Sequence, residues 1–520
     1  MRQALTTVKA VCPHDCPDTC GMVVTVEEGR AVKLRGDAEH PFTRGALCRK
    51  VNHYLERVYH PERLLYPLRR VGRKGEGRFE RISWPVALRE IGERFRQISR
   101  EFGPEAILPY SYAGTLGKVQ AESLDRRFFH RLGASLLDRT ICATAGATGC
   151  DITLGTRAVM DPEATGLART IVNWGSNTVV TNMHQWTLMH QARKEGALII
   201  TIDPHKTQTA EKSDWWLPIR PGTDAALGLG VMHILFRDSL EDCEYLERYC
   251  LGSEQLRERV LRDYPPDKVA KITGLAVADI ERLASEIGRS FALRKGPTLL
   301  RLNYGLQRHG GGGMAVRTLC CLPAITGDWR HPGGGAMLST SKMFPWNSAA
   351  LQRADLIRPG TRTINMVTIG DDLQREASAA FGPKIEALLV YNSNPVAVAP
   401  ESRKVVAGFQ RSDLFTVVLE HFMTDTADLA DYVLPATTQL EHLDVHTTYG
   451  HTDVLMNHPA IAPVGEAKPN TQIFRELAAA MGFDEACFTE SDEQLARQAL
   501  HDSLDFDALR AQGWLSLPVP

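Results

Sequence analysis

The chain has 520 residues, of which 43% are hydrophobic and 23% are charged, and its formal net charge is −2. This composition is ordinary for a globular protein, and the length predicts about three domains. No long basic block occurs, so the sequence excludes nucleic acid as the main partner. No apolar run is long enough to cross a bilayer, so direct membrane insertion is not expected.

The cysteines are distributed unevenly. Four of the eleven lie within the first 48 residues. The odd number and the uneven spread argue against a framework of disulfide bonds. The residues before Cys12 contain neither a twin-arginine pair nor the apolar core of a secretory signal. We therefore expect a cytoplasmic protein with reduced cysteines.

The first predicted element is a loop-rich module over residues 1–65, dense in cysteine, proline and glycine. Apolar residues alternate on both sides of the turn Glu28-Gly29, which predicts a short hairpin over residues 21–35. Val32 and Leu34 are expected to alternate on its second strand.

A helix is predicted to begin at Ser83. Serine is a favoured cap, and Pro85 occupies the first turn, where its missing N–H costs little. Apolar residues at helical spacing follow, and Gly103 ends the pattern. The next strand is expected at residues 106–108.

Two strand–helix–strand units follow, far apart in the chain. The first has strands at 170–174 and 198–202, and the second has strands at 388–391 and 415–419. Polar loops follow these strands. In parallel sheets, ligands bind beyond the carboxyl ends of the strands, so two such units suit a ligand with two similar halves.

Two glycine-rich segments lie between these units. They span His309 to Gly313 and Gly333 to Gly335. Glycine lets the backbone approach a bulky ligand closely, but flexible surface loops have the same composition. Both explanations are open from the sequence.

The most specific motif is C-P-H-D-C-P-D-T-C at residues 12–20. Cys12, Cys16 and Cys20 are each separated by three residues, and Cys48 follows 27 residues later. Three close thiols with a distant fourth are typical of a 4Fe-4S cluster. Zinc is the main alternative, but structural zinc sites usually pair their ligands in two short knuckles.

This module, followed by Arg49 and Lys50, resembles the cluster domain of molybdopterin oxidoreductases of the dimethyl-sulfoxide-reductase family, such as formate dehydrogenases and nitrate reductases. The resemblance covers almost the whole chain. It implies that Lys50 lies between the cluster and a pterin. It also implies an α/β fold: a small iron–sulfur domain plus two doubly wound α/β domains related by a pseudo-twofold axis.

The resemblance also implies domain limits. The iron–sulfur domain takes residues 1–65, together with part of 440–470. A discontinuous α/β domain takes residues 66–140 and 340–520. The second α/β domain, residues 141–339, is inserted between its two pieces.

The segment I-C-A-T-A-G-A-T-G at 141–149 resembles the part of the family that supplies the protein ligand of the metal. Cys142 is therefore the candidate thiolate ligand of molybdenum or tungsten, with Cys150 as the second choice. A buried, inert cysteine is the alternative for either position. Ala143 stands where formate dehydrogenases have a histidine, which argues against formate oxidation.

The polar loops resemble those that hold two molybdopterin guanine dinucleotides on the metal. One half is represented by W-G-S-N at 174–177, by 202–207 and by 220–224; the other is represented by 391–395 and 428–435. The residues implied in cofactor binding, besides Lys50, are Gly175, Asn177, Asp203, Asp224, Asn392 and Asn394. Carboxylates such as those of Asp203 and Asp224 accept hydrogen bonds from guanine N–H groups.

Arg308 and His309 follow a predicted strand and are candidates for the metal cavity. Arginine suits an anionic substrate, and histidine moves protons near neutral pH. A solvated polar loop is the alternative interpretation.

Two functions remain open. The first is a molybdopterin oxidoreductase that carries out a two-electron reaction or an oxygen- or sulfur-atom transfer on a small molecule. Its cluster would exchange electrons with a redox partner protein or subunit. The second is a metal-free electron-relay or scaffold subunit that keeps only the fold and the cluster. Cys142 favours the enzyme, whereas the absence of the family's C-terminal β-barrel favours the second function, a fragment or a shortened relative.

Overall fold

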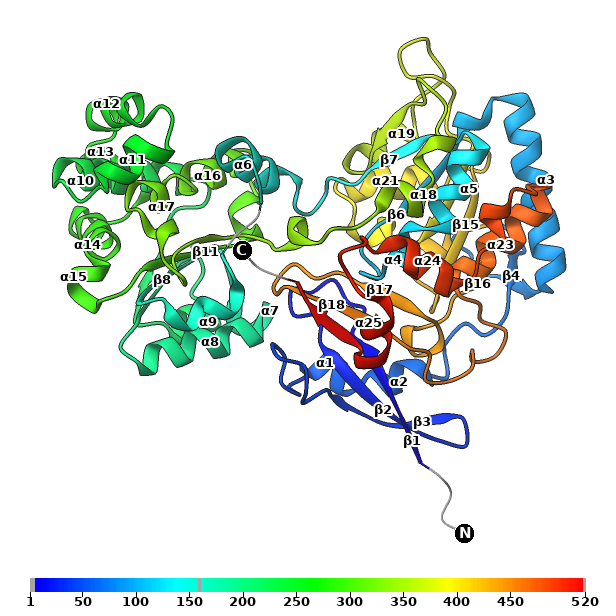
Figure 1. The fold of residues 1–520 in the computed structure, drawn as a ribbon. Helices are drawn as coiled ribbons and strands as arrows, with labels where there is room; N and C mark the ends of the chain where they lie inside the picture. Colours follow the sequence, from blue (N-terminus) through cyan, green and yellow to red (C-terminus); the bar gives the residue numbers. More distant parts are fainter. Residues whose placement is uncertain (1–4, 158–159, 518–520) are drawn as a thin grey trace.

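The computed structural model describes residues 5–157 and 160–517. Two α/β lobes lie beside each other, each built on its own sheet, and a small N-terminal sheet lies below one of them (Figure 1). This arrangement confirms the predicted α/β fold with a separate cysteine module. No helix in the described part of the chain is both long and apolar enough to cross a membrane.

The first lobe contains a five-stranded, fully parallel sheet in the order β10-β9-β8-β11-β12. Its strands are β8 (Thr170–Trp174), β9 (Leu198–Ile202), β10 (Trp215–Leu217), β11 (Thr298–Leu302) and β12 (Gly335–Met337). The predicted bounds of β8 and β9 are confirmed. Strands buried on both faces are near-continuous apolar runs, as these are.

Alternate residues of these strands face two different helical layers. Ile171 and Ile199 pack against α8, whereas Val172 and Ile200 pack against α10 and α14. The helices of this lobe are α6 (Thr144–Leu154), α7 (Thr178–Thr181), α8 (Met183–Lys194), α9 (Gln208–Lys212), α10 (Asp224–Arg237), α11 (Cys243–Tyr249), α12 (Ser253–Asp263), α13 (Pro266–Thr273), α14 (Val277–Gly288), α15 (Ser290–Arg294), α16 (Gly312–Leu319) and α17 (Leu322–Ile325). The single helix predicted after β8 is divided into α7 and α8 at Asn182.

The second lobe contains a six-stranded sheet in the order β5-β4-β16-β15-β14-β6, in which the last four strands are parallel. Its strands are β4 (Leu68–Arg70), β5 (Phe79–Arg81), β6 (Ile107–Ser111), β14 (Ala387–Tyr391), β15 (Phe415–Glu420) and β16 (Tyr432–Pro435). The two edge strands β4 and β5 are antiparallel additions.

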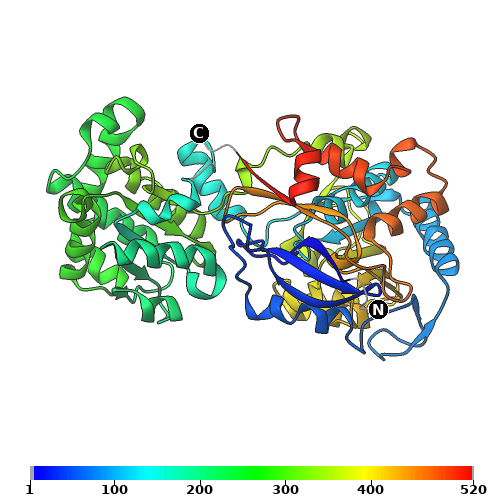
Figure 2. The same ribbon diagram turned by 60° about the horizontal axis from the view of Figure 1, so that its bottom comes forward.

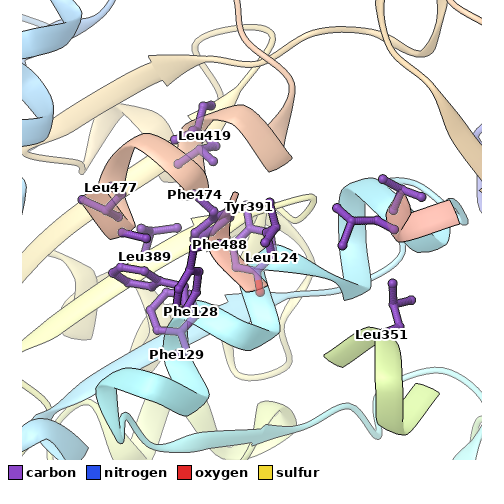
Figure 3. Close-up of a cluster of buried hydrophobic side chains, with 14 of the residues drawn as sticks. Leu124, Phe128, Phe129, Leu351, Leu389, Tyr391, Leu419, Phe474, Leu477 and Phe488 are labelled. Carbon is purple, nitrogen blue, oxygen red and sulfur yellow. The ribbon is translucent and has the colours of Figure 1, made fainter. Parts of the chain in front are cut away.

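One face of this sheet carries the largest apolar core. Leu124, Phe128 and Phe129 of α5 meet Phe474 of α23 over Tyr391 of β14 (Figure 3). The helices of the second lobe include α3 (Trp84–Glu101), α4 (Lys118–Glu122), α5 (Leu124–Leu132), α18 (Ser348–Gln352), α19 (Ile369–Asp372), α20 (Pro395–Val398), α21 (Ser402–Phe409), α22 (Asp425–Asp428), α23 (Asn470–Met481), α24 (Asp492–Ala499) and α25 (Phe506–Gln512). The predicted start of α3 at the Ser83 cap is confirmed.

The two lobes contain a repeat with a constant offset in residue number. Asn177 accepts a hydrogen bond from the Thr209 hydroxyl at 2.8 Å, and Asn394 accepts one from the Thr426 hydroxyl at 2.6 Å. Both pairs are separated by 32 residues, and both members move by 217 between the lobes (177 to 394, 209 to 426). Strands β8, β9 and β10 correspond at the same offset to β14, β15 and β16.

The fourth strand of the parallel set differs in origin. In the first lobe it is β11, which comes after β8 in the chain, and in the second it is β6, which comes before β14. The two lobes are therefore repeats of one design with different connections. This is the relation that the predicted pseudo-twofold axis requires. The domain limits themselves stay a prediction.

The N-terminal module is a three-stranded antiparallel sheet of β1 (Thr6–Val11), β2 (Gly21–Glu27) and β3 (Arg30–Gly36). The predicted hairpin is confirmed, but Val32 is 46% exposed. The register shifts between Thr25 and Val26, so that Ala31 becomes the buried residue of β3. A bulge of this kind reverses the faces of the residues that follow.

The C-terminal strands pack on this module. They are β17 (Asp444–His446), β18 (Asp453–Asn457) and β19 (Trp514–Ser516). Both views place them beside the N-terminal strands (Figure 1 and Figure 2). The Asn457 side chain accepts a hydrogen bond from the backbone N–H of Val11 at 2.9 Å, which ties the two sheets together.

The glycine-rich segments are explained by internal packing. A Cβ atom at Gly312 would lie 2.2 Å from the Cα of Gln307, and one at Gly149 would lie 2.5 Å from the Gly313 carbonyl oxygen. A Cβ atom at Gly334 would lie 2.3 Å from the Asp328 carbonyl oxygen. These glycines let neighbouring backbones touch, so the explanation as free surface loops is wrong at these positions.

Buried histidines predict an acid-sensitive fold. Burial lowers the pKa of His421 and His446 to about 3 and that of His442 to about 4. Unfolding restores an ordinary pKa, so the unfolded chain binds protons that the folded chain does not. Stability is therefore complete above the ordinary histidine pKa and is lost as the pH falls. With three protons, the free energy of unfolding should drop by about 3–4 kcal/mol between about pH 6 and 5.

Urea unfolding across this pH range measures the effect. The variant His446→Asn should show a slope about one third smaller, because one proton is removed from the difference. An identical slope in the variant would contradict the assignment.

Candidate active site

The four N-terminal cysteines lie together as reduced thiols. Cys12 and Cys20 are buried, and Cys16 and Cys48 are partly buried. Burial raises the pKa of Cys12 and of Cys16 to about 12, and the nearby charge of Cys48 raises both further. Buried thiols of this kind become thiolates only when a cation replaces their protons.

The donor set fits a 4Fe-4S cluster. Three thiols come from one short loop, and Cys48 comes from the residue that precedes helix α1 (Arg49–Asn52). The loop is anchored to the first lobe through Asp18. Its carboxylate accepts hydrogen bonds from the Asn182 amide at 2.5 Å and from the backbone N–H of Met183 at 3.1 Å, and it lies 3.0 Å from His184 Nδ1.

Cys142 lies in the wall of a cavity of about 200 Å³ between the two lobes, which we call the inner cavity. The opposite parts of its wall come from distant segments: Asp15 of the cysteine loop, Tyr112 after β6, Tyr304 after β11, and Tyr449 before β18. Ala143 also lines it, so the position that carries a histidine in formate dehydrogenases is small and apolar here.

Two side chains from the segment after β11 hold the Cys142 backbone. The Gln307 amide and the Arg308 guanidinium each donate to the Cys142 carbonyl oxygen at 2.9 Å. Arg308 Nη2 also lies 3.9 Å from the Cys142 sulfur. The structure thus brings together two of the three residues predicted for the reaction centre.

The environment of the Cys142 thiol pulls in two directions. Burial raises its pKa, and the charge of Asp15 adds to this effect, whereas contact with Arg308 and with Tyr112 lowers it. A thiolate at this position would therefore be stabilised by a cation and by a phenol hydroxyl. Cys150 does not point here: it is buried with its sulfur 3.6 Å from that of Cys320.

His309 lies elsewhere than predicted. Its Nε2 is 3.6 Å from the Asp224 carboxylate, which also accepts a hydrogen bond from Trp174 Nε1 at 2.8 Å. Within residues 5–157 and 160–517, His309 is not part of the inner cavity wall. Its role in proton transfer stays a prediction.

The residues predicted for the first dinucleotide gather at the carboxyl ends of β8 and β9. Gly175 has a φ of 61°, and a Cβ atom there would lie 2.9 Å from the Leu306 nitrogen. Burial raises the pKa of Asp203, and the nearby charge of Asp224 raises it further, so the two carboxylates lie near each other. Asn177 closes the same loop through its bond to Thr209.

The residues predicted for the second dinucleotide occupy the corresponding place in the other lobe. Asn392 lines a separate cavity at the carboxyl ends of β14 to β16, together with His14 of the cysteine loop. Asn394 binds Thr426, as its counterpart Asn177 binds Thr209. The charge of Lys50 lowers the pKa of both His14 and Cys12, so this lysine lies between the thiols and the cavity.

The comparisons with known proteins agree with this geometry. Residues 63–480 match the family model described as molybdopterin oxidoreductase, and residues 5–60 match the molybdopterin oxidoreductase Fe4S4 domain. The chain belongs to the molybdopterin oxidoreductase family. It is therefore a molybdopterin-dependent oxidoreductase, whose cofactors are a 4Fe-4S cluster and a molybdenum bis-pterin centre.

Several proteins resemble this molybdopterin oxidoreductase over nearly its full length. The probable oxidoreductase YoaE of Bacillus subtilis is 46% identical over 98% of this chain and 74% of its own length. Acetylene hydratase of Syntrophotalea acetylenica is 31% identical over 92% of this chain and 69% of its own length. The structure of acetylene hydratase from Pelobacter acetylenicus matches with a TM-score of 0.80 and 27% identity, over 98% of this chain and 74% of that one. Nothing in these matches favours the metal-free relay.

The sequence prediction missed four residues of the inner cavity. They are Asp15, Tyr112, Tyr304 and Tyr449. Only Asp15 had a local signal, because it stands between two predicted cluster ligands. The tyrosines converge from three distant segments, which no local pattern reveals.

Proposed function

We propose that Cys142 is the protein ligand of the molybdenum and that a small-molecule substrate reacts in the inner cavity. The observation that supports this most directly is the position of the Cys142 thiol. It lines a cavity between the two repeated lobes, against Arg308, at the point where two dinucleotide halves would meet. A soft thiolate is a suitable ligand for molybdenum or tungsten.

When bound, the metal centre supplies two-electron chemistry; the protein orients and tunes it. Arg308 holds positive charge beside the Cys142 sulfur, which favours the thiolate that a metal requires. Gln307 donates to the Cys142 carbonyl and accepts from the backbone N–H of Gly146, so it fixes the start of α6 from both sides. Arg308 also lies where it can hold an anionic substrate, and His309 is retained as a candidate proton carrier.

Gly175, Asn177, Asp203 and Asp224 are proposed to bind the first dinucleotide, with the carboxylates accepting hydrogen bonds from guanine. Asn392 and Asn394 are proposed to bind the second. The repeat adds Glu420, which occupies the position of Asp203 at the offset of 217 and ends β15. Burial raises the pKa of Glu420, as it does that of Asp203.

Cys12, Cys16, Cys20 and Cys48 are proposed to hold the cluster, with Lys50 between it and the nearer pterin. One cluster carries one electron at a time, so a redox partner protein would exchange electrons with it twice per turnover. The reduced state of the cysteines supports a cytoplasmic location. The sheets support domain limits of 1–65, 141–339, and 66–140 with 340–520.

The variant Cys142→Ala tests the proposed ligand. We expect the number of sulfur atoms bound to molybdenum, measured by X-ray absorption, to fall by one. Turnover with reduced viologen and a panel of oxides should fall by about a thousandfold or more, the size of effect seen when a transition-state interaction is removed. Iron content should not change.

Cys150→Ala is the matched control, because it removes the second-choice cysteine from the same helix. It should keep both the sulfur coordination and the turnover. An unchanged metal environment in Cys142→Ala, or a changed one in Cys150→Ala, would reject Cys142 as the ligand.

A further inference from the structure

A second cavity lies next to the inner cavity and shares part of its wall. This outer cavity encloses about 360 Å³, and it reaches the surface beside the exposed residue Ala354. Glu122, Arg126 and Arg139 line both cavities. These three side chains therefore form the wall that separates the Cys142 thiol from the outer cavity.

The dividing wall carries an excess of positive charge. The Glu122 carboxylate is already held by Lys118 at 2.9 Å and by the Gln352 amide at 3.3 Å. Arg139 donates only to neutral groups, the carbonyl oxygens of Ser111 and Leu137 and the Ser111 hydroxyl. In the part of the chain that the structure describes, no carboxylate forms an ion pair with Arg139.

Arg126 is the second cation of the wall, and its side chain is only 13% exposed. Its nearest carboxylate, Asp125, lies 3.6 Å away and accepts a hydrogen bond from the Tyr391 hydroxyl at 2.7 Å. Burial raises the pKa of Asp125, which weakens its neutralising effect. Positive charge in a narrow, partly dehydrated passage attracts anions and raises their local concentration.

The wall is built on a rigid element. Arg126 and His130 lie four residues apart on α5 and so share one face of the helix. The opposite face buries Leu124 and Phe128 in the large apolar core (Figure 3). The backbone around Arg126 is therefore fixed, and only the side chains of the wall need to move when a molecule passes.

The outer cavity is separate from both proposed dinucleotide sites. Its walls come from α4 and α5, β7 (Leu136–Asp138), the end of β6 and the segment 352–357. None of the residues proposed to bind a dinucleotide contributes to it. This separation argues that the arginines serve a molecule other than the cofactor.

We propose that the outer cavity is the route to the reaction centre and that Arg126 and Arg139 select small anions as substrates. The inference rests on the proposed role of Cys142, because it assigns the passage to the cavity in which that residue lies. It goes further by naming the chemical class of the substrate and the two residues that determine it. Asp15 lines the inner cavity but is not part of the dividing wall.

Alkylation of the metal-free full-length chain tests this without any assumption about turnover. Iodoacetate and iodoacetamide have similar size and differ by one negative charge. Their rates at Cys142, measured by mass spectrometry, give a ratio that does not depend on the thiolate fraction. Dividing this ratio by that of the exposed Cys243 in the same sample removes the intrinsic difference between the reagents.

We expect the normalised ratio in the wild type to favour iodoacetate about fivefold, and to fall about threefold or more in Arg126→Gln and in Arg139→Gln. It should also fall as salt screens the charges. Arg126→Lys and Arg139→Lys keep the charge and should keep the ratio. Arg259→Gln is the matched control, because it removes one charge from a side chain that is 70% exposed.

A normalised ratio of one or less in the wild type, or a ratio that neither the glutamine variants nor salt changes, would overturn the proposal. The salt dependence of the wild type decides the matter even if a variant does not fold. Loss of guanine nucleotide from the loaded Arg139→Gln enzyme would assign the arginine to the cofactor and also overturn it. Failure of Cys142 to bind molybdenum would leave the alkylation result valid, so the two proposals fail separately.

Discussion

The variant Cys20→Ala is expected to lose nearly all of its iron, from about four atoms per chain to fewer than about one. Cys20 is 5% exposed and supplies one of three thiols on a single short loop. Without it, one corner of the cluster has no protein ligand. The remaining thiols regain their protons, since burial holds their pKa values far above the ordinary value.

Iron analysis and the visible absorbance of anaerobically purified protein measure this loss. Cys243→Ala is the matched control, because Cys243 is exposed and lies on α11 in the other lobe. It should keep full iron content. A Cys20→Ala protein with unchanged iron, or a wild type that contains zinc in place of iron, would contradict the cluster assignment.

The cysteine module was predictable because its information is local. Three ligands lie within nine residues, and the spacing alone distinguishes a cubane from a zinc knuckle. The strands at 170–174 and 198–202 were predictable for a similar reason, because buried parallel strands are short apolar runs that end in polar turns. Both features depend on neighbours in the sequence.

The repeat was also present in the sequence but lay outside the pattern that the loops alone suggest. The run T-Q-T-A at 207–210 returns as T-D-T-A at 424–427, with Asp214 and Asp431 in equivalent positions. Each of these aspartates accepts a hydrogen bond from the first part of the middle strand, at Ile199 and at Thr416. A comparison of the chain with itself at an offset of 217 would have found it.

The inner cavity could be predicted only in part. Cys142 and Arg308 were expected near the metal, but their direct contact depends on how tightly α6 and α16 pack, and this is set by glycines at 149 and 313. His309 follows Arg308 in sequence, yet it turns to Asp224 because the chain reverses direction before α16. Adjacent residues at the end of a short helix do not share a face, so sequence proximity could not decide this.

The repeat also shows where the two lobes differ. Glu441 stands at the position of Asp224, 217 residues later, but the two carboxylates have different surroundings. Asp224 faces Trp174 and His309. Glu441 is fully buried and bonded to Arg63 at 2.6 Å, in a pair of which the side chains are 0% and 1% exposed. In the second lobe this acid therefore joins the residues near 63 to the segment 436–464, and it is not free to bind a dinucleotide.

The Arg63–Glu441 pair is expected to be a major contribution to the stability of this region. Glu441 also accepts hydrogen bonds from Thr438 and from the backbone N–H of Val464 at 2.7 Å, so it stays buried when Arg63 is removed. Arg63→Met leaves this charge without a partner and should lower the free energy of unfolding by about 3–5 kcal/mol. The double variant Arg63→Met/Glu441→Gln should recover part of the loss, because the unpaired charge is gone.

Urea unfolding of the two variants beside the wild type measures the difference. The matched control is Arg262→Met, whose partner Glu258 is 77% exposed and whose own side chain is 62% exposed. Exposed pairs contribute little, so this variant should change stability by less than about 1 kcal/mol. If Arg63→Met costs no more than Arg262→Met, then the backbone contacts of the region, and not the buried charge pair, hold the cysteine module against the second lobe.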